Sequence, residues 1–266
     1  MSSRQAADSL NMNPDLLQGV HIVLVGTTHP GNIGATARAM KNMGLSRLWL
    51  VQPRHFPHAE ASVRASGADD ILSAATVCPS LDEAIRDCAL VLGTSARTRS
   101  IAWPELGIRE GARRCVDQAP RGGAALVFGR EKAGLSNDEL DRCHFLTRIP
   151  CNPDFSSLNL AASVQVLSYE LRMAAEADVG PAPAFEDPDD RPASAGELGH
   201  FYTHLQNLLI RLEFLDPRNP RHLMRRLRRL YNRVHPSRRE LNILRGILTA
   251  CGRHLDTTGG PPRPAP

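Results

Sequence analysis

Short apolar segments alternate with helix-forming segments between residues 18 and 174, and this alternation restricts the possible folds of the chain more than any other feature. The apolar segments are short and rich in β-branched residues, as buried parallel strands are. We predict strands at Val20–Val25, Arg47–Val51, Ala89–Gly93, Ala124–Phe128 and Phe145–Ile149. We predict helices at Ile33–Met43, Ser80–Asp87, Pro104–Val116 and Ser157–Ala175. The pattern predicts an α/β fold with a parallel sheet and helices on both faces, whose ligand lies where the carboxyl ends of the strands meet.

Composition argues against several classes of protein. Hydrophobic residues make up 42% of the chain, but no apolar run reaches the ~18 residues of a membrane span, so we expect no membrane partner. The six cysteines form no Cys-x-x-Cys pair, so we expect neither a metal site nor a disulfide framework. Residues 1–13 are polar and lack the pattern of an export signal, which favours a cytoplasmic protein.

Two changes in composition divide the chain. Residues 176–196 hold six acidic residues and four prolines against one arginine, which is typical of a linker. Residues 197–255 carry leucines at helical spacing, with twelve arginines, four acidic residues and a net charge of +8. We therefore predict a disordered extension at 1–17, an α/β domain at 18–175, an acidic Pro-rich linker at 176–196, a small all-helical domain at 197–255 and a disordered tail at 256–266.

Five of the arginines cluster on one predicted helix, and these are Arg225, Arg226, Arg228, Arg229 and Arg233. Such a cluster favours a polyanionic partner, because guanidinium groups bind phosphates. A plain alternative is that these side chains only solubilise a small helical bundle.

The segment Pro30–Gly44 follows the first predicted strand. We expect Asn32 to cap a helix there and Gly44 to end it. Gly34 and Arg38 are four residues apart and share a helix face, so we expect Arg38 to fill the space beside Gly34.

Three later segments also follow strands: Gly93–Arg97, Phe128–Leu135 and Ile149–Val164. Gly129 lies just past a strand, where a glycine lets a ligand approach the backbone. Ser156, Ser157 and Asn159 place polar groups at the start of the last predicted helix.

Together these segments resemble the motifs of the SPOUT-class RNA 2′-O-ribose methyltransferases, also called the SpoU type. The first motif is similar to Asn32-x-Gly34-x-x-x-Arg38, the second to Phe128-Gly129-x-Glu131-x-x-Gly134, and the third to Ser157-Leu158-Asn159 followed by Ala161-Ala162. The order and spacing of all three motifs agree. The resemblance is strongest to members that methylate tRNA and carry an appended C-terminal helical domain.

The resemblance implies a deep trefoil knot at the C-terminal end of the α/β domain, S-adenosylmethionine as the cofactor, and a homodimer with shared active sites. It implies that the target is cytidine or uridine at position 32 of the anticodon loop. With tRNA as the substrate, the charge of the arginine cluster leads us to expect that these arginines contact tRNA. By motif match, the cofactor-binding residues are Thr94, Ser95, Ala96, Gly129, Ile149, Ser156, Ser157 and Leu158. The catalytic residues are Arg38, Asn32, Ser157, Asn159 and Glu131.

Methyl transfer requires that the ribose hydroxyl is held in line with the methyl group and loses its proton. Arg38 is a poor base, because a guanidinium keeps its proton at any physiological pH. It could instead clamp an RNA phosphate and stabilise a developing alkoxide, and both roles stay open. We expect Asn32, Ser157 and Asn159 to orient the hydroxyl and Arg38. Glu131 is expected to pair with an arginine or to help bind the ribose.

Other readings fit less well. The glycines after the first strand do not form G-x-G-x-x-G, and no acidic residue ends the second strand, which disfavours a dinucleotide enzyme. Ser95 lacks the closing glycine of a nucleophile elbow, which disfavours a serine hydrolase. A ribosomal-RNA methyltransferase of the same class and a non-catalytic RNA-binding protein remain as alternatives.

Overall fold

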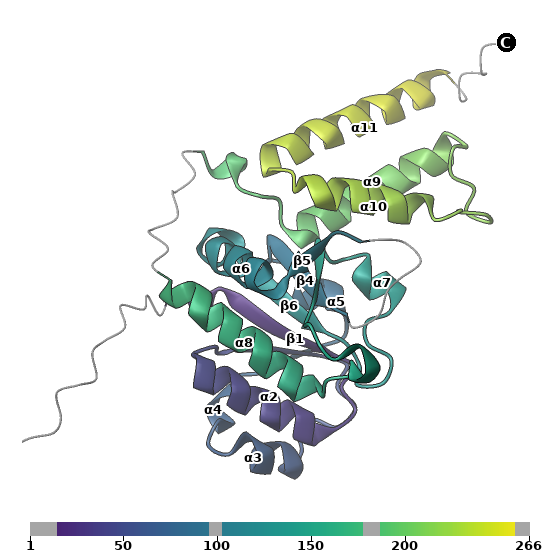
Figure 1. Ribbon diagram of the computed structural model, residues 1–266. Coiled ribbons are helices and arrows are strands. Elements are labelled where there is room, and N and C mark those ends of the chain that lie inside the picture. The colour runs from purple at the N-terminus through teal and green to yellow at the C-terminus, as the bar shows by residue number, and fades with distance from the viewer. Residues whose placement is uncertain (1–14, 96–102, 178–186, 259–266) are drawn as a thin grey trace, which may run out of the picture.

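The computed structural model describes residues 15–95, 103–177 and 187–258, and a parallel sheet of seven strands forms its centre (Figure 1). The strands are β1 (Val20–Val25), β2 (Arg47–Val51), β3 (Thr76–Cys78), β4 (Leu90–Thr94), β5 (Glu105–Gly107), β6 (Ala124–Phe128) and β7 (Phe145–Arg148). They lie in the order β3-β2-β1-β6-β4-β7-β5, and every pair of neighbours is parallel. The predicted parallel α/β sheet is thus confirmed, and β3 and β5 are additional short strands at its two edges.

Helices cover both faces of the sheet, as predicted. They are α1 (Asp15–Gln18), α2 (Pro30–Met43), α3 (Ala59–Ala65), α4 (Asp69–Ser73), α5 (Leu81–Ala84), α6 (Ile108–Gly122), α7 (Asn137–Leu140) and α8 (Leu160–Glu176). Ile22 and Leu24 of β1 pack in one core cluster with α2, α6 and α8, while Val23 and Val25 pack in a second cluster with α5 and α7. Because both sides of each central strand are buried, the strands read as continuous apolar runs.

Several predicted helix starts were wrong. Helix α2 begins at Pro30, with His29 at the N-cap, so Asn32 lies inside the first turn and does not cap it. Proline suits the first turn of a helix because it lacks the N–H that would be unpaired there. Helix α6 begins at Ile108, because the residues after Pro104 form β5. Helix α8 begins at Leu160, where Asn159 caps it by accepting from the N–H groups of Ala161 and Ala162.

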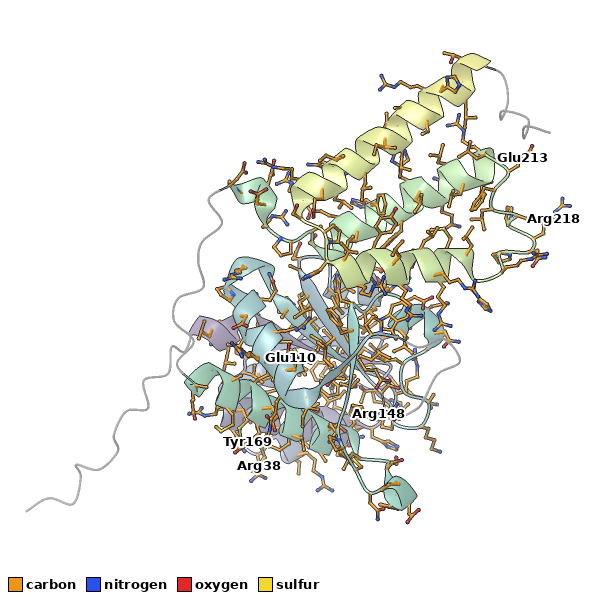
Figure 2. All side chains as sticks on the ribbon, turned by 45° about the horizontal axis from the view of Figure 1, so that its top comes forward. Arg38, Glu110, Arg148, Tyr169, Glu213 and Arg218 are labelled. Atoms are coloured by element: carbon orange, nitrogen blue, oxygen red, sulfur yellow. The ribbon has the colours of Figure 1, made fainter. Side chains whose placement is uncertain are left out.

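Gly34 has a different role from the one predicted. A Cβ at this position would lie 2.0 Å from the carbonyl oxygen of Ala61, so the glycine lets α2 approach the backbone of α3. Arg38 does not fill this space. Its side chain is exposed and projects from α2 toward solvent (Figure 2).

The C-terminal part is helical, as predicted, and lies at one end of the molecule (Figure 1). It contains a short 3-10 turn, η2 (Pro188–Asp190), and three helices, α9 (Ala195–Arg211), α10 (Leu223–Val234) and α11 (Arg238–Thr258). Leu198, Phe201 and Leu241 belong to its own apolar cluster.

Ordered structure extends past two predicted boundaries, because α1 begins at Asp15 and α11 continues to Thr258. Leu17 of α1 is buried in the main core, so the predicted extension at 1–17 ends earlier than expected. No helix in the described ranges is long and apolar enough to cross a bilayer.

Candidate functional site

A pocket of about 160 Å³ opens at the carboxyl ends of β4, β6 and β7, which are neighbours in the sheet. Seven of the eight residues predicted to bind the cofactor line it: Thr94, Ser95, Gly129, Ile149, Ser156, Ser157 and Leu158. Ala96 lies outside the described residues. Glu131 lines the same pocket, so residues far apart in the sequence meet at one place.

The pocket also contains Thr147, which the sequence did not single out. Its side chain is buried, and its Oγ1 has no hydrogen-bond partner among the described residues. The only sign of it in the sequence was a threonine near the end of a predicted strand. This oxygen has almost no exposed surface, so it does not open into the pocket.

Gly129 is required by the loop itself. A Cβ there would lie 2.1 Å from the carbonyl carbon of Gly134, so the turn closes on its own backbone rather than on a ligand. The N–H of Arg130 donates to the carbonyl oxygen of Gly134 at 3.2 Å, and the reverse bond measures 2.8 Å. Gly134 adopts a φ of +68°, which favours glycine. These contacts hold the residues after β6 as a tight turn at the rim of the pocket.

The carboxylate of Glu131 lies against the start of α2. It accepts from the N–H groups of Thr28 and His29 at 3.2 Å, from Oγ1 of Thr28 at 2.9 Å and from Nδ2 of Asn32 at 3.0 Å. Asn159 Nδ2 in turn donates to Oδ1 of Asn32 at 3.0 Å. The three segments that carry the motifs are therefore joined by one hydrogen-bond network.

This network sets the charge state of Glu131. Burial raises the pKa of the carboxyl, but hydrogen bonds from Asn32, His29 and Thr28 outweigh burial and lower the pKa to about 2. The expected pairing of Glu131 with an arginine is not seen among the described residues, where its side chain accepts hydrogen bonds from Thr28, His29 and Asn32. The neighbouring Arg130 pairs instead with Glu139, with Nη1 at 3.0 Å from each carboxylate oxygen.

Arg38 does not line the pocket of its own chain. It forms no hydrogen bond or ion pair with any residue of the described ranges. Figure 2 shows Arg38 and Tyr169 at the end of the molecule opposite to Glu213 and Arg218. The structure thus brings together Asn32, Glu131 and Asn159, but leaves Arg38 apart from them.

The five clustered arginines of α10 divide into two groups. Arg225 and Arg228 face the protein, where Nε of Arg225 donates to Oδ1 of Asp141 at 2.6 Å and the guanidinium of Arg228 lies 4.5 Å from the ring centre of Tyr202. Only 10% of the Arg225 side chain is exposed. Arg226 and Arg233 are exposed, and Arg229 is half-buried.

Polar contacts attach α10 to the α/β part. Asn232 Nδ2 donates to the carbonyl oxygen of Cys143 at 3.2 Å, and its Oδ1 accepts from the Tyr202 hydroxyl at 2.6 Å. His235 Nε2 lies 2.7 Å from the carbonyl oxygen of Ala89. Together with the contact of Arg225 to Asp141 near the start of α10, these bonds fix both ends of the helix to the residues that precede β4 and β7.

Fold and site together define an α/β protein with a ligand pocket at adjacent strand ends and an attached basic helical region. The chain belongs to the SpoU rRNA methylase family, whose model matches residues 19–169. Residues 196–260 match the model for the C-terminal domain of the tRNA methyltransferase TrmJ.

Known proteins resemble nearly the whole chain. The tRNA (cytidine/uridine/adenosine-2′-O-)-methyltransferase TrmJ of Pseudomonas aeruginosa is 56% identical over 88% of this chain and 94% of its own length. The tRNA (cytidine/uridine-2′-O-)-methyltransferase TrmJ of Sodalis glossinidius is 46% identical over 94% of this chain and 96% of its own length. The crystal structure of TrmJ from Z. mobilis ZM4 superposes with a TM-score of 0.76 at 35% identity, covering 87% of this chain and 98% of that one.

Proposed function

We propose that this protein transfers the methyl group of S-adenosylmethionine to the ribose 2′-hydroxyl of a tRNA nucleotide. The observation that carries the proposal is the pocket at the ends of β4, β6 and β7, where the residues matched to cofactor binding meet. The names of the TrmJ relatives support tRNA as the substrate. We further propose cytidine or uridine at position 32 of the anticodon loop as the target.

The residues present fit this cofactor. Ile149 and Leu158 offer apolar contact for a nucleobase, and Ser156 and Ser157 offer hydroxyls for its polar groups. When bound, the sulfonium supplies a methyl group already activated for displacement. The loops around the pocket hold the donor and exclude water from it.

The remaining work falls to side chains around the ribose. Arg38 keeps its positive charge, and without an ion pair in the described structure it is available to clamp an RNA phosphate. In this proposal Ser157 orients the 2′-hydroxyl, and its exposed position on the pocket wall supports that role. Asn32 and Asn159 hold each other and the start of α8.

We also propose a homodimer in which Arg38 of one copy completes the pocket of the other. Support comes from the position of Arg38 outside the pocket of its own chain. The apolar side chains of α2 and α8 give no such support, because Met40, Val164 and Leu167 are buried in the core of the single chain. Sedimentation at micromolar concentration is expected to show a dimer, and a stable, active monomer would contradict it.

The finer features of the fold are part of the same proposal. They are a deep trefoil knot formed by the segments after β6 and β7, a small all-helical domain with its own apolar core, and action in the cytoplasm. Of the predicted linker at 176–196, the part from Asp187 onward already packs with the helical region, and α9 begins at Ala195. The family resemblance supports the knot. The separate apolar cluster of α9 to α11 supports the domain.

The deciding experiment is methylation of an unmodified tRNA transcript with S-adenosylmethionine, followed by nucleoside mass spectrometry. A 2′-O-methylated pyrimidine from the anticodon loop is expected. Methylation of ribosomal RNA alone would favour the ribosomal-RNA alternative. RNA binding without any methylation would favour the non-catalytic alternative.

A further inference from the structure

Helix α2 has no cap of its own. His29 occupies the N-cap position but makes no side-chain hydrogen bond there. The N–H groups of Thr28 and His29, just before the first helical turn, donate to the Glu131 carboxylate, which lies 103 residues after Thr28 in the sequence. The negative charge of Glu131 also lies at the positive end of the helix dipole. Glu131 therefore holds the residues that lead into α2 from another part of the chain.

Thr28 donates more hydrogen bonds to this carboxylate than any other described residue does. Its N–H lies 3.2 Å from both carboxylate oxygens, and its Oγ1 donates to Oε2 at 2.9 Å. With the further bonds from His29 and Asn32, most of the lone pairs of Glu131 are used within the protein. Little acceptor capacity is left for a ribose or an arginine.

We propose that Thr28 is a positioning residue for methyl transfer, which with Glu131 fixes the start of α2 and hence the place of Arg38. This inference rests on the proposed function and concerns the same site. Helix α2 runs without interruption from Pro30 past Arg38, so a shift at its start displaces the guanidinium. Misplacement of a catalytic group by about 1 Å can cost about 10²-fold in rate. Glu131 is then also a positioning residue, and it need not contact RNA.

The neighbouring threonine supplies a matched control. Thr27 is buried, and its Oγ1 has no hydrogen-bond partner among the described residues. Thr27→Val and Thr28→Val make the same chemical change at adjacent positions, but only the second removes a hydrogen bond to an ionised group. A hydrogen bond of this kind is among the stronger ones in proteins.

The test compares wild type, Thr27→Val, Thr28→Val and Thr28→Ser in single-turnover methylation of tRNA. Thr28→Val is expected to lower the transfer rate about tenfold or more, with the Kd for S-adenosylmethionine by calorimetry unchanged. Thr28→Ser keeps the hydroxyl and is expected to recover most of the rate. Thr27→Val is expected to match wild type.

A double-mutant cycle with Glu131→Gln identifies the route of the effect. If Thr28 acts through Glu131, Thr28→Val should cost much less in the Glu131→Gln background than in wild type. Fully additive effects would overturn the inference, and so would a Thr28→Val rate equal to that of Thr27→Val. An inactive wild-type enzyme would instead refute the proposed function, so the two failures are distinct.

Discussion

The side chain of Arg38 projects into solvent from α2, whereas the pocket is lined by the loops after β4, β6 and β7. Removing its guanidinium should therefore leave cofactor binding intact. Arg38→Ala is expected to lower the methyl-transfer rate by about 10²–10³ with an unchanged Kd for S-adenosylmethionine, as measured by single-turnover assay and calorimetry. The exposed Arg113 on α6 offers a control, since Arg113→Ala removes the same charge at a position outside the three motifs. Near-normal turnover in Arg38→Ala would exclude Arg38 from the reaction.

The hydrogen bonds to Glu131 predict an acid-dependent contribution to stability. Its pKa is about 2 in the folded protein against an ordinary value of 4.5. A carboxyl with a lowered pKa stabilises the fold above its ordinary pKa and loses that contribution as the pH falls toward the folded value. The difference in Tm between wild type and Glu131→Gln should therefore be largest above pH 4.5 and shrink between pH 4.5 and about 2. Melting curves across this range test it, and a constant difference would contradict it.

Seven residues that the motifs assigned to cofactor binding line one pocket, because the segments that carry them follow strands whose carboxyl ends lie at one edge of the sheet. Their role in binding the cofactor stays a prediction. The partners of these residues could not be predicted. The bonds of Thr28 to Glu131 join loops about a hundred residues apart, and their geometry depends on how the whole sheet is assembled. The unpaired hydroxyl of Thr147 was hidden for a related reason, since one threonine in a strand looks like any other.

At the scale of helices, the contact between α2 and α3 makes a sharp prediction. Gly34→Ala would place a Cβ 2.0 Å from the carbonyl oxygen of Ala61, and backbone cannot move aside cheaply. Overpacking of this kind typically costs about 1–3 kcal/mol or more. Gly246 of α11 is the matched control, because nothing lies within 4 Å of its Cβ position.

Gly246→Ala should stabilise the protein by up to about 1 kcal/mol through helix propensity alone. Chemical denaturation of both variants gives the comparison. Equal effects of the two substitutions would contradict the close approach of α2 to α3.

The positions of strands were predicted well where the sequence has a long apolar run, and the starts of helices were predicted poorly where a single proline or asparagine was the only indication. The bounds of β1, β2 and β6 agree with the prediction because these strands are long apolar runs between turns. Strands β3 and β5 have three residues each and are largely exposed, so they carry no apolar run. Pro104 suggests a helix start, but it leads into the edge strand β5. Asn32 suggests an N-cap, but α2 already begins at Pro30.

For the whole molecule, charge on the outer side of α10 predicts how tRNA binding responds to salt. Arg226, Arg229 and Arg233 remain available to phosphates, while Arg225 and Arg228 pack inward. Changing the three outer arginines to Ala should weaken tRNA binding. It should also flatten the slope of log affinity against log salt by about two to three units.

A charge-matched control changes three exposed arginines of the α/β part, namely Arg47, Arg109 and Arg113. Filter binding across a salt series measures both variants. Equal slopes for the two variants would mean that the outer arginines of α10 only provide solubility.

Fewer arginines of the C-terminal region are free to bind phosphates than its net charge of +8 suggests. Arg239 pairs with Asp187 and Asp190, and Arg238 lies 3.4 Å from Asp189, so the acidic segment neutralises part of the basic one. Composition shows how many charges a region holds. It does not show which of them face each other, because that depends on the fold.

The contacts of α10 change what a shortened chain could tell an experimenter. Asp141 sits half-buried against Arg225, and burial raises its pKa even with this partner beside it. A chain cut after α8 would leave that carboxylate without its counter-charge and uncover the carbonyl oxygens of Ala89 and Cys143. A loss of tRNA affinity in such a chain could come from destabilisation of the α/β part or from the loss of the tRNA-binding surface, and the measurement would not separate the two causes. The helical region therefore stabilises the α/β part through these contacts, in addition to its proposed role in binding tRNA. Point substitutions on the outer side of α10 separate the two contributions, because they leave the contacts with the α/β part in place.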